Sequence, residues 1–100
     1  MVRHVILWQL KDEISGSEKE IVKKGIKEGL EGLKGKIEGL VEIKVNESPL
    51  PSSNADVMLD SLFESADALK NYSTHPAHVE VANGKVRPYT KARTCMDFEV

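Results

Sequence analysis

Residues 2–10, VRHVILWQL, are apolar on both faces of the strand that they are expected to form. A strand alternates its side chains between two faces, so a sheet containing this one must be covered on both sides. A fold with helices on only one side would leave half of these apolar groups in water. One face carries Val2, His4, Ile6, Trp8 and Leu10. The other face carries Arg3, Val5, Leu7 and Gln9.

Hydrophobic periodicity predicts three further strands and three helical segments. Strands are expected at residues 40–48, 56–63 and 93–100, where apolar and polar residues alternate. A long helix is expected from an N-cap at Ser15 or Ser17 to about residue 40, because apolar residues recur at spacings of three and four. Shorter helices are expected at residues 64–72, capped by Ser65, and 75–84, begun by Pro76 and ended by Gly84.

The order of these elements is β-α-β-β-α(α)-β, which predicts an α+β ferredoxin-like sandwich with an antiparallel four-stranded sheet. We expect one domain over residues 1–100. Helices cover one face of such a sheet, so we expect the other face to meet a second copy across a two-fold axis in a homodimer. The alternative is that the second face is ordinary exposed apolar surface.

Composition excludes several classes of partner. Charged residues make up 30% of the chain, the net charge is −2, and the Lys and Arg residues are scattered, so neither nucleic acid nor a membrane surface is expected as a partner. The first apolar run is too short to span a membrane and lacks a signal-peptide cleavage site. Cys95 is the single cysteine, cannot form an internal disulfide, and is expected to be inert. We expect a cytoplasmic protein.

The predicted first helix contains five glycines, each costing about 1 kcal/mol relative to Ala in a helix interior. One interpretation is that another element, such as the second helix, approaches this side closely. The other is that Gly35 or Gly39 ends the helix and the remaining glycines are tolerated. The five are Gly25, Gly29, Gly32, Gly35 and Gly39.

The stretch NYSTHPAHVEV gathers a tyrosine and two histidines. With Pro76 as the first helical residue, His75 is the N-cap and His78 lies in the first turn, where the helix dipole disfavours an imidazolium. A neutral His78 with a lowered pKa is able to act as a general base, and Tyr72 could orient a carbonyl oxygen. If the His4 face looks at the helices, His4 joins them in an internal pocket with Trp8 as a wall.

Each of these residues has a structural alternative. His75 is most simply a solvent-exposed cap, His4 a core histidine with satisfied hydrogen bonds, and Tyr72 a core residue. A zinc site formed by His4, His75 and His78 is disfavoured, because the two C-terminal histidines lack the usual i,i+4 spacing and no acidic residue accompanies them. We therefore expect no metal and no cofactor.

Three stretches, VRHVILWQLKDE, YSTHPAHV and RTCMDFEV, resemble the Dabb family of stress-responsive dimeric α/β-barrel domains over essentially the whole chain. The resemblance implies a ferredoxin-like protomer whose sheet pairs with a second sheet to close a barrel. The family includes a plant polyketide cyclase, olivetolic acid cyclase. Similarity to it implies that His78 acts as base, Tyr72 assists, and His4 lies in the pocket. We expect His75 and Trp8 to contact the substrate together with His4.

Two functions follow from these patterns. The first is a pocket that binds a carbonyl or polyketide-like compound and uses His78 and Tyr72 for proton transfer, which requires a cavity of roughly 300 Å³. The second is a non-catalytic stress or assembly protein, in which Trp8, Leu30 and Phe63 fill the cavity and the histidines bond to the backbone.

Overall fold

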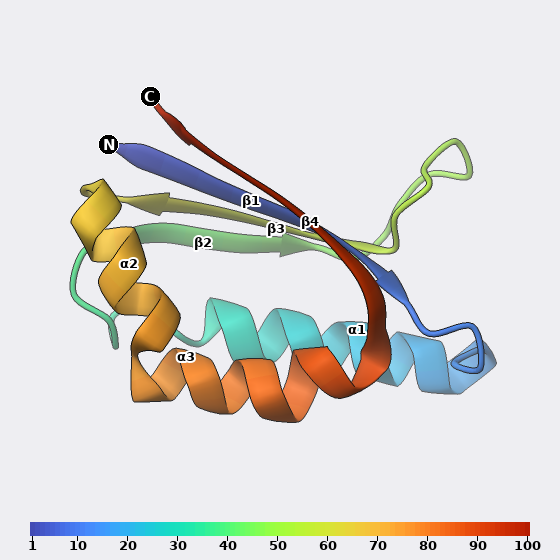
Figure 1. Ribbon diagram of the computed structural model, residues 1–100. Helices are drawn as coiled ribbons and strands as arrows, with labels where there is room; N and C mark the ends of the chain where they lie inside the picture. The colour runs from blue at the N-terminus through green and yellow to red at the C-terminus, as the bar shows by residue number, and fades with distance from the viewer.

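A computed structural model describes residues 1–100 as one four-stranded antiparallel sheet with helices on a single face (Figure 1). The strand order is β2-β3-β1-β4. This confirms the predicted ferredoxin-like α+β sandwich. The elements are β1 (Val2–Leu10), α1 (Gly16–Glu31), β2 (Leu40–Asn46), β3 (Val57–Phe63), α2 (Ala66–Thr74), α3 (Pro76–Val81), the π-helical turn η1 (Ala82–Val86), the 3-10 turn η2 (Arg87–Tyr89) and β4 (Thr90–Glu99).

The first helix is shorter than its hydrophobic periodicity predicted. It begins after Ser15 and ends at Glu31, so the expectation that it continues to about residue 40 was wrong. Gly35 and Gly39 have φ angles of 83° and 86°, a left-handed region that side chains rarely adopt. Leu33 and Ile37 stay buried beside the helix although they lie in irregular backbone.

Two glycines allow close approach between elements. A Cβ at Gly29 would lie 2.9 Å from a methyl carbon of Val81 in α3, and a Cβ at Gly39 would lie 2.5 Å from the Cβ of Ala68 in α2. The close-approach interpretation therefore holds at Gly29, where the second helical region packs against α1. The prediction that Gly35 or Gly39 ends the helix was wrong, because the C-cap of α1 is Gly32.

The second helical region starts as predicted and ends later. Ser65 caps α2 by accepting a hydrogen bond from the Ala68 N–H at 3.1 Å. His75 caps α3, with Pro76 in the first helical position. Gly84 does not terminate this segment, because the backbone passes through it in η1 and η2 before β4 begins. This extension carries the chain along α1 and then up to the edge of the sheet (Figure 1).

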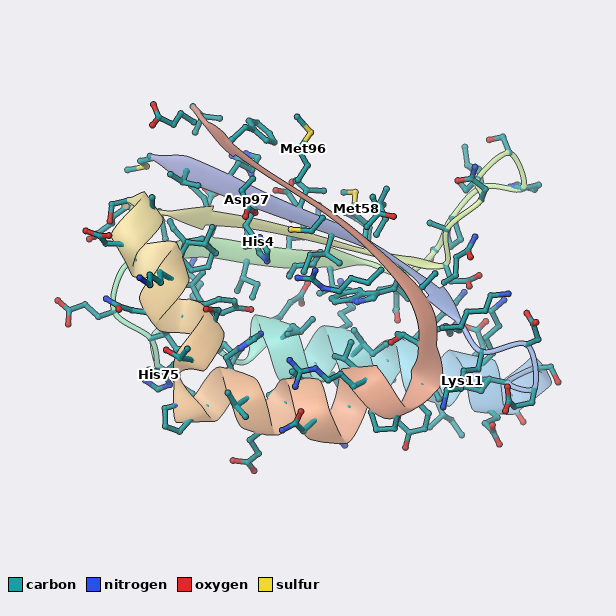
Figure 2. The ribbon with its side chains drawn as sticks, viewed as in Figure 1. His4, Lys11, Met58, His75, Met96 and Asp97 are labelled. Atoms are coloured by element: carbon teal, nitrogen blue, oxygen red, sulfur yellow. The ribbon has the colours of Figure 1, made fainter.

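The core lies between the sheet and the helices. The inward side chains of β1 and β3 are buried with α1 and Tyr72 of α2, while Met58 and Met96 point away from the helices on the open face (Figure 2). Leu7 and Phe98 on that open face remain 39% and 38% exposed. The inward residues of β1 and β3 are Val2, His4, Ile6, Trp8, Leu10, Val57, Leu59, Ser61 and Phe63.

The two edges of the sheet differ in whether side chains of a helix bond to their backbone. At the β2 edge, Glu31 accepts a hydrogen bond from the Val45 N–H at 2.9 Å, and the Lys27 ammonium donates to the Val45 carbonyl at 2.8 Å. Burial opposes the charged form of Glu31, but the bond from Val45 and the Lys27 charge outweigh it and lower the pKa of this carboxyl. At the other edge, β4 is exposed from Lys91 onward.

None of the helices is long and apolar enough to cross a membrane.

Candidate functional site

A cavity of about 130 Å³ lies between the sheet and the second helical region. It is smaller than the roughly 300 Å³ expected of a small-molecule site. A groove of about 660 Å³ between α2 and β4 adjoins it and shares four of its residues, His4, Leu69, Ser73 and Arg93. The cavity is lined by His4, Ile6, Trp8, Leu30, Leu59, Leu69, Tyr72, Ser73, His78, Ala82, Val86, Arg87, Thr90 and Arg93.

Tyr72 is fixed in this cavity by aromatic packing. Its ring lies 4.8 Å from the Phe63 ring and 4.3 Å from the His78 ring, centroid to centroid, and the residue is 1% exposed. Its hydroxyl is buried and has no hydrogen-bond partner. Burial raises the pKa of Tyr72, so the phenol stays protonated and keeps a proton to donate.

His78 is held in one tautomer by the backbone. Its Nδ1 lies 3.2 Å from the Ser73 carbonyl oxygen, which can only accept, so Nδ1 carries the proton and Nε2 carries a lone pair. Burial lowers the pKa of His78, and the charges of Arg87 and Arg93 add to this effect against the Ser73 hydrogen bond. The lowered pKa agrees with the sequence prediction, although burial rather than the helix dipole is the main cause.

His4 reaches the cavity from β1 and is bound on one side by β4. Its Nδ1 forms a short hydrogen bond with the Asp97 carboxylate, and the two residues face each other in Figure 2. The Cys95 sulfur lies 3.7 Å from the same nitrogen. The His4 ring is 6.3 Å from the Tyr72 ring, so β1 and α2 bring these two predicted residues to the same cavity.

The remaining predicted residues divide between the cavity and the surface. Trp8 is 5% exposed and forms part of the wall, as expected. His75 lies outside the cavity, at the junction of α2 and α3 (Figure 2). Its Nδ1 accepts a hydrogen bond from the Ala77 N–H at 3.1 Å, as in the capping alternative.

One cluster has the donor atoms of a metal site, but not the one considered from the sequence. His4, Cys95 and Asp97 offer ligand atoms within 4.8 Å of one another, whereas His75 is not among them. The hydrogen bond between His4 and Asp97 already satisfies both groups. Burial and the neighbouring Asp97 charge raise the pKa of the Cys95 thiol, which favours the protonated form over a metal-binding thiolate.

Two arginines at this site were missed by sequence reasoning. Arg87 precedes Pro88 in η2, and Arg93 lies on the inward side of β4 opposite Trp8. Both line the cavity. The alternation of residues 93–100 could have placed Arg93 on the same face as Cys95 and Asp97, but no local pattern indicated that the segment before β4 brings Arg87 back to the cavity.

Comparison with known proteins gives a family match over residues 2–100, to the stress responsive A/B barrel domain, Dabb. An uncharacterized protein of Streptomyces coelicolor is 38% identical over 80 residues, which cover 78% of this chain and 79% of that protein. A dimeric protein of unknown function with a ferredoxin-like fold from Bacteroides fragilis is 32% identical, with a TM-score of 0.92 over 99% of this chain and 95% of that one. A hydroxynitrile lyase from Passiflora edulis has the same fold at 17% identity, with a TM-score of 0.72 over 97% and 90%.

Proposed function

The chain belongs to the Dabb family of stress-responsive A/B barrel domains, and we propose that it is a homodimer that binds a small carbonyl compound in its internal cavity. In this proposal, His78 and Tyr72 are catalytic residues that move a proton of the bound compound. His4 and Trp8 contact the compound as walls of the cavity.

The observation that carries this proposal is the unpartnered hydroxyl of Tyr72. A buried polar group without a hydrogen bond costs about 1–3 kcal/mol, so native proteins rarely keep one without a use. A carbonyl oxygen in the cavity would accept a hydrogen bond from this hydroxyl. The surrounding apolar wall would strengthen such a bond because little water competes for it.

The proton transfer follows from the tautomer of His78. Its free Nε2 takes a proton from the carbon beside the carbonyl, and the C–H electron pair becomes the C=C bond of an enolate. Charge develops on the carbonyl oxygen, where the Tyr72 hydroxyl stabilises it by hydrogen bonding. Return of the proton to the same or a neighbouring atom regenerates neutral His78. The Ser73 carbonyl holds the ring throughout by accepting from Nδ1.

The open face of the sheet supports the homodimer. Leu7, Met96 and Phe98 expose apolar surface there, although helices cover only the opposite face. Burial of such surface against a second copy is favourable, and a two-fold axis makes the patch complementary to itself. The dimeric Bacteroides protein of the same fold has a similar sequence.

The cavity volume favours the second function, a non-catalytic stress or assembly protein. Trp8 and Leu30 reduce the space as that hypothesis predicts, and His78 bonds to a backbone carbonyl. His4 bonds to a carboxylate instead, and Phe63 does not line the cavity. The Tyr72 hydroxyl has no role in this alternative.

Hydrogen–deuterium exchange at carbon distinguishes the two functions. We expect the protein to accelerate deuterium uptake beside the carbonyl of benzylacetone, benzoylacetone or benzylpyruvate in heavy water, followed by NMR. Tyr72→Phe and His78→Gln should each lower the rate by about 10²–10⁴-fold, the range typical of general acid–base catalysis. Tyr89→Phe and His75→Gln are matched controls, because neither residue lines the cavity. Equal rates in all variants would support the non-catalytic alternative.

Sedimentation tests the homodimer. The substitution Met96→Glu would place an unpaired charge in the buried interface, which is unfavourable. We therefore expect this variant to sediment as a monomer at micromolar concentration, while the wild type sediments as a dimer. Ile21→Glu is the control, because Ile21 is an exposed apolar residue on α1, away from the sheet. A monomeric wild type would refute the proposed dimer.

A further inference from the structure

We propose that the carbonyl compound carries an anionic group, a carboxylate or a phosphate ester, held at the mouth of the cavity by Arg87 and Arg93. This inference rests on the proposed function and adds the class of substrate. The two guanidinium groups come from η2 and β4, so the ligand would bridge the second helical region and the uncovered edge of the sheet.

The first observation is that neither arginine has an acidic partner. Arg3, the third arginine of the chain, pairs with Asp60 at 2.7 Å on the open face. Arg87 and Arg93 have no carboxylate within 4.0 Å, although both line the cavity. Asp97 lies four residues beyond Arg93 on the same side of β4, but its carboxylate contacts His4 instead.

The second observation is that Arg87 is oriented by a neighbour. Its guanidinium donates a short hydrogen bond to the side-chain oxygen of Asn83, one turn earlier in η1. Such a bond uses one of five donors, so the others stay available for an anion. Guanidinium groups bind carboxylates and phosphates through two parallel hydrogen bonds, which suits a fixed arginine better than a mobile lysine.

The third observation concerns the field inside the cavity. Both arginines lower the pKa of His78 through their charges, which places positive potential at the proposed base. An anion bound between them would offset that potential. The inner wall is apolar, with Ile6, Trp8 and Val86, so the charge is best placed at the mouth and the uncharged part of the ligand inside.

These features define the ligand. It has an apolar body small enough for the cavity, a carbonyl that reaches Tyr72, and an anionic end in the groove beside Arg93, which lines both the cavity and the groove. Benzylpyruvate has this pattern. Benzylacetone has the same ring and carbonyl but carries a methyl group in place of the carboxylate, so the pair differs only in the feature under test.

The experiment measures dissociation constants of benzylpyruvate, benzylacetone and phenethyl phosphate by calorimetry. We expect an anion to bind at least tenfold more tightly than benzylacetone. Arg87→Gln and Arg93→Gln should each weaken anion binding about tenfold and leave benzylacetone unchanged, and the Arg→Lys variants should restore part of the loss. Lys34→Gln is the control for charge alone, since Lys34 is an exposed cation outside the cavity. Higher ionic strength should reduce the anion preference.

The outcomes separate this inference from the proposed function. Phenethyl phosphate lacks the carbonyl, so tighter binding of it than of benzylpyruvate would identify the anion as a phosphate ester. Tighter binding of benzylpyruvate than of benzylacetone, lost in the arginine variants, would identify a carboxylate as an anion that the site accepts. The inference would be overturned if benzylacetone and both anions bound equally tightly, or if the arginine variants lost the same affinity for all three ligands. Either result would leave the proposed carbonyl site intact. No binding of any compound by the wild type would overturn both.

Discussion

The β2 and β4 edges of the sheet differ in what protects them. Lys27 and Glu31 of α1 bond to the outer backbone of β2 at Val45, so this edge is closed to pairing with another chain. No helix covers β4 in this way (Figure 1), and its inward side chains line the groove that leads to the cavity. The difference indicates that the β2 edge is protected by α1, whereas the β4 edge is where the proposed function places ligand access.

Tight packing and an accessible site have opposite requirements, and the fold assigns them to different strands of the sheet. Phe63 of β3 is fully buried, whereas Arg93, Cys95 and Asp97 of β4 are exposed. Substitutions on the first side should therefore change the free energy of unfolding, and substitutions on the second should change binding while the protein stays folded.

The largest effect is expected for Phe63→Ala. Truncation of a buried phenylalanine costs about 3–5 kcal/mol of unfolding free energy, from lost burial and the cavity left behind. Phe98→Ala, on the open face of the edge strand β4, should cost much less when both variants are made in the Met96→Glu monomer, because Phe98 is 38% exposed in the protomer. Urea unfolding of both variants measures the difference, and equal losses would mean that the β3 and β4 sides of the sheet do not differ in stability.

Glu31→Gln should have the next largest effect, because it removes the charge that closes the β2 edge. Loss of a charge-assisted hydrogen bond lowers the free energy of unfolding by about 1–3 kcal/mol. The Glu31 side chain is partly exposed, so we expect a value at the lower end of this range. Glu28→Gln is the control, since Glu28 forms only an exposed contact with Lys24 at 3.9 Å. The pKa of Glu31 is lowered, so its contribution should be present above about pH 4.5 and be lost as the pH falls through the folded value. Equal urea midpoints for the two variants would contradict this function of Glu31.

A smaller effect is expected from the protonation of His78. Its folded pKa is lowered, mainly by burial, so the unfolded chain binds a proton first as the pH falls below about 6.5. The free energy of unfolding should therefore decrease from about pH 7 toward about pH 5, and His78→Gln should remove part of that decrease. Urea unfolding across this range tests the expectation, and an NMR titration that placed the pKa above the ordinary value would contradict it.

The smallest change in stability is expected for Tyr72→Phe, although this variant should lose activity. The hydroxyl has no partner, so its removal leaves no other polar group unsatisfied. We expect a change between zero and a gain of about 1 kcal/mol. A clear loss of stability in thermal unfolding would show that the hydroxyl has a structural partner, such as a bound water, and would weaken the argument for a ligand carbonyl.

The sequence placed most of the candidate site, because local rules control those residues. A proline in the first turn fixes where α3 begins, and this puts His75 at the cap and His78 in the first turn. Strand alternation put His4 and Trp8 on one face. The same reasoning failed for the end of α1, because apolar spacing continues through Leu33 and Ile37 although the helix has already ended at Glu31, with Gly32 as its C-cap.

The sequence by itself determined the order of elements, the two-faced first strand and the position of His78 near a helix start, because these depend on periodicity and short-range chemistry. The burial that lowers the pKa of His78 comes from the tertiary structure. Only the tertiary structure decided which side chains share the cavity. The contact of His4 with Asp97 spans 93 residues, and the path of η1, η2 and β4 brings Arg87 and Arg93 to the cavity that His78 lines. Such juxtapositions depend on how helices pack on a sheet, and local patterns in a single chain do not encode the distances between elements far apart in sequence.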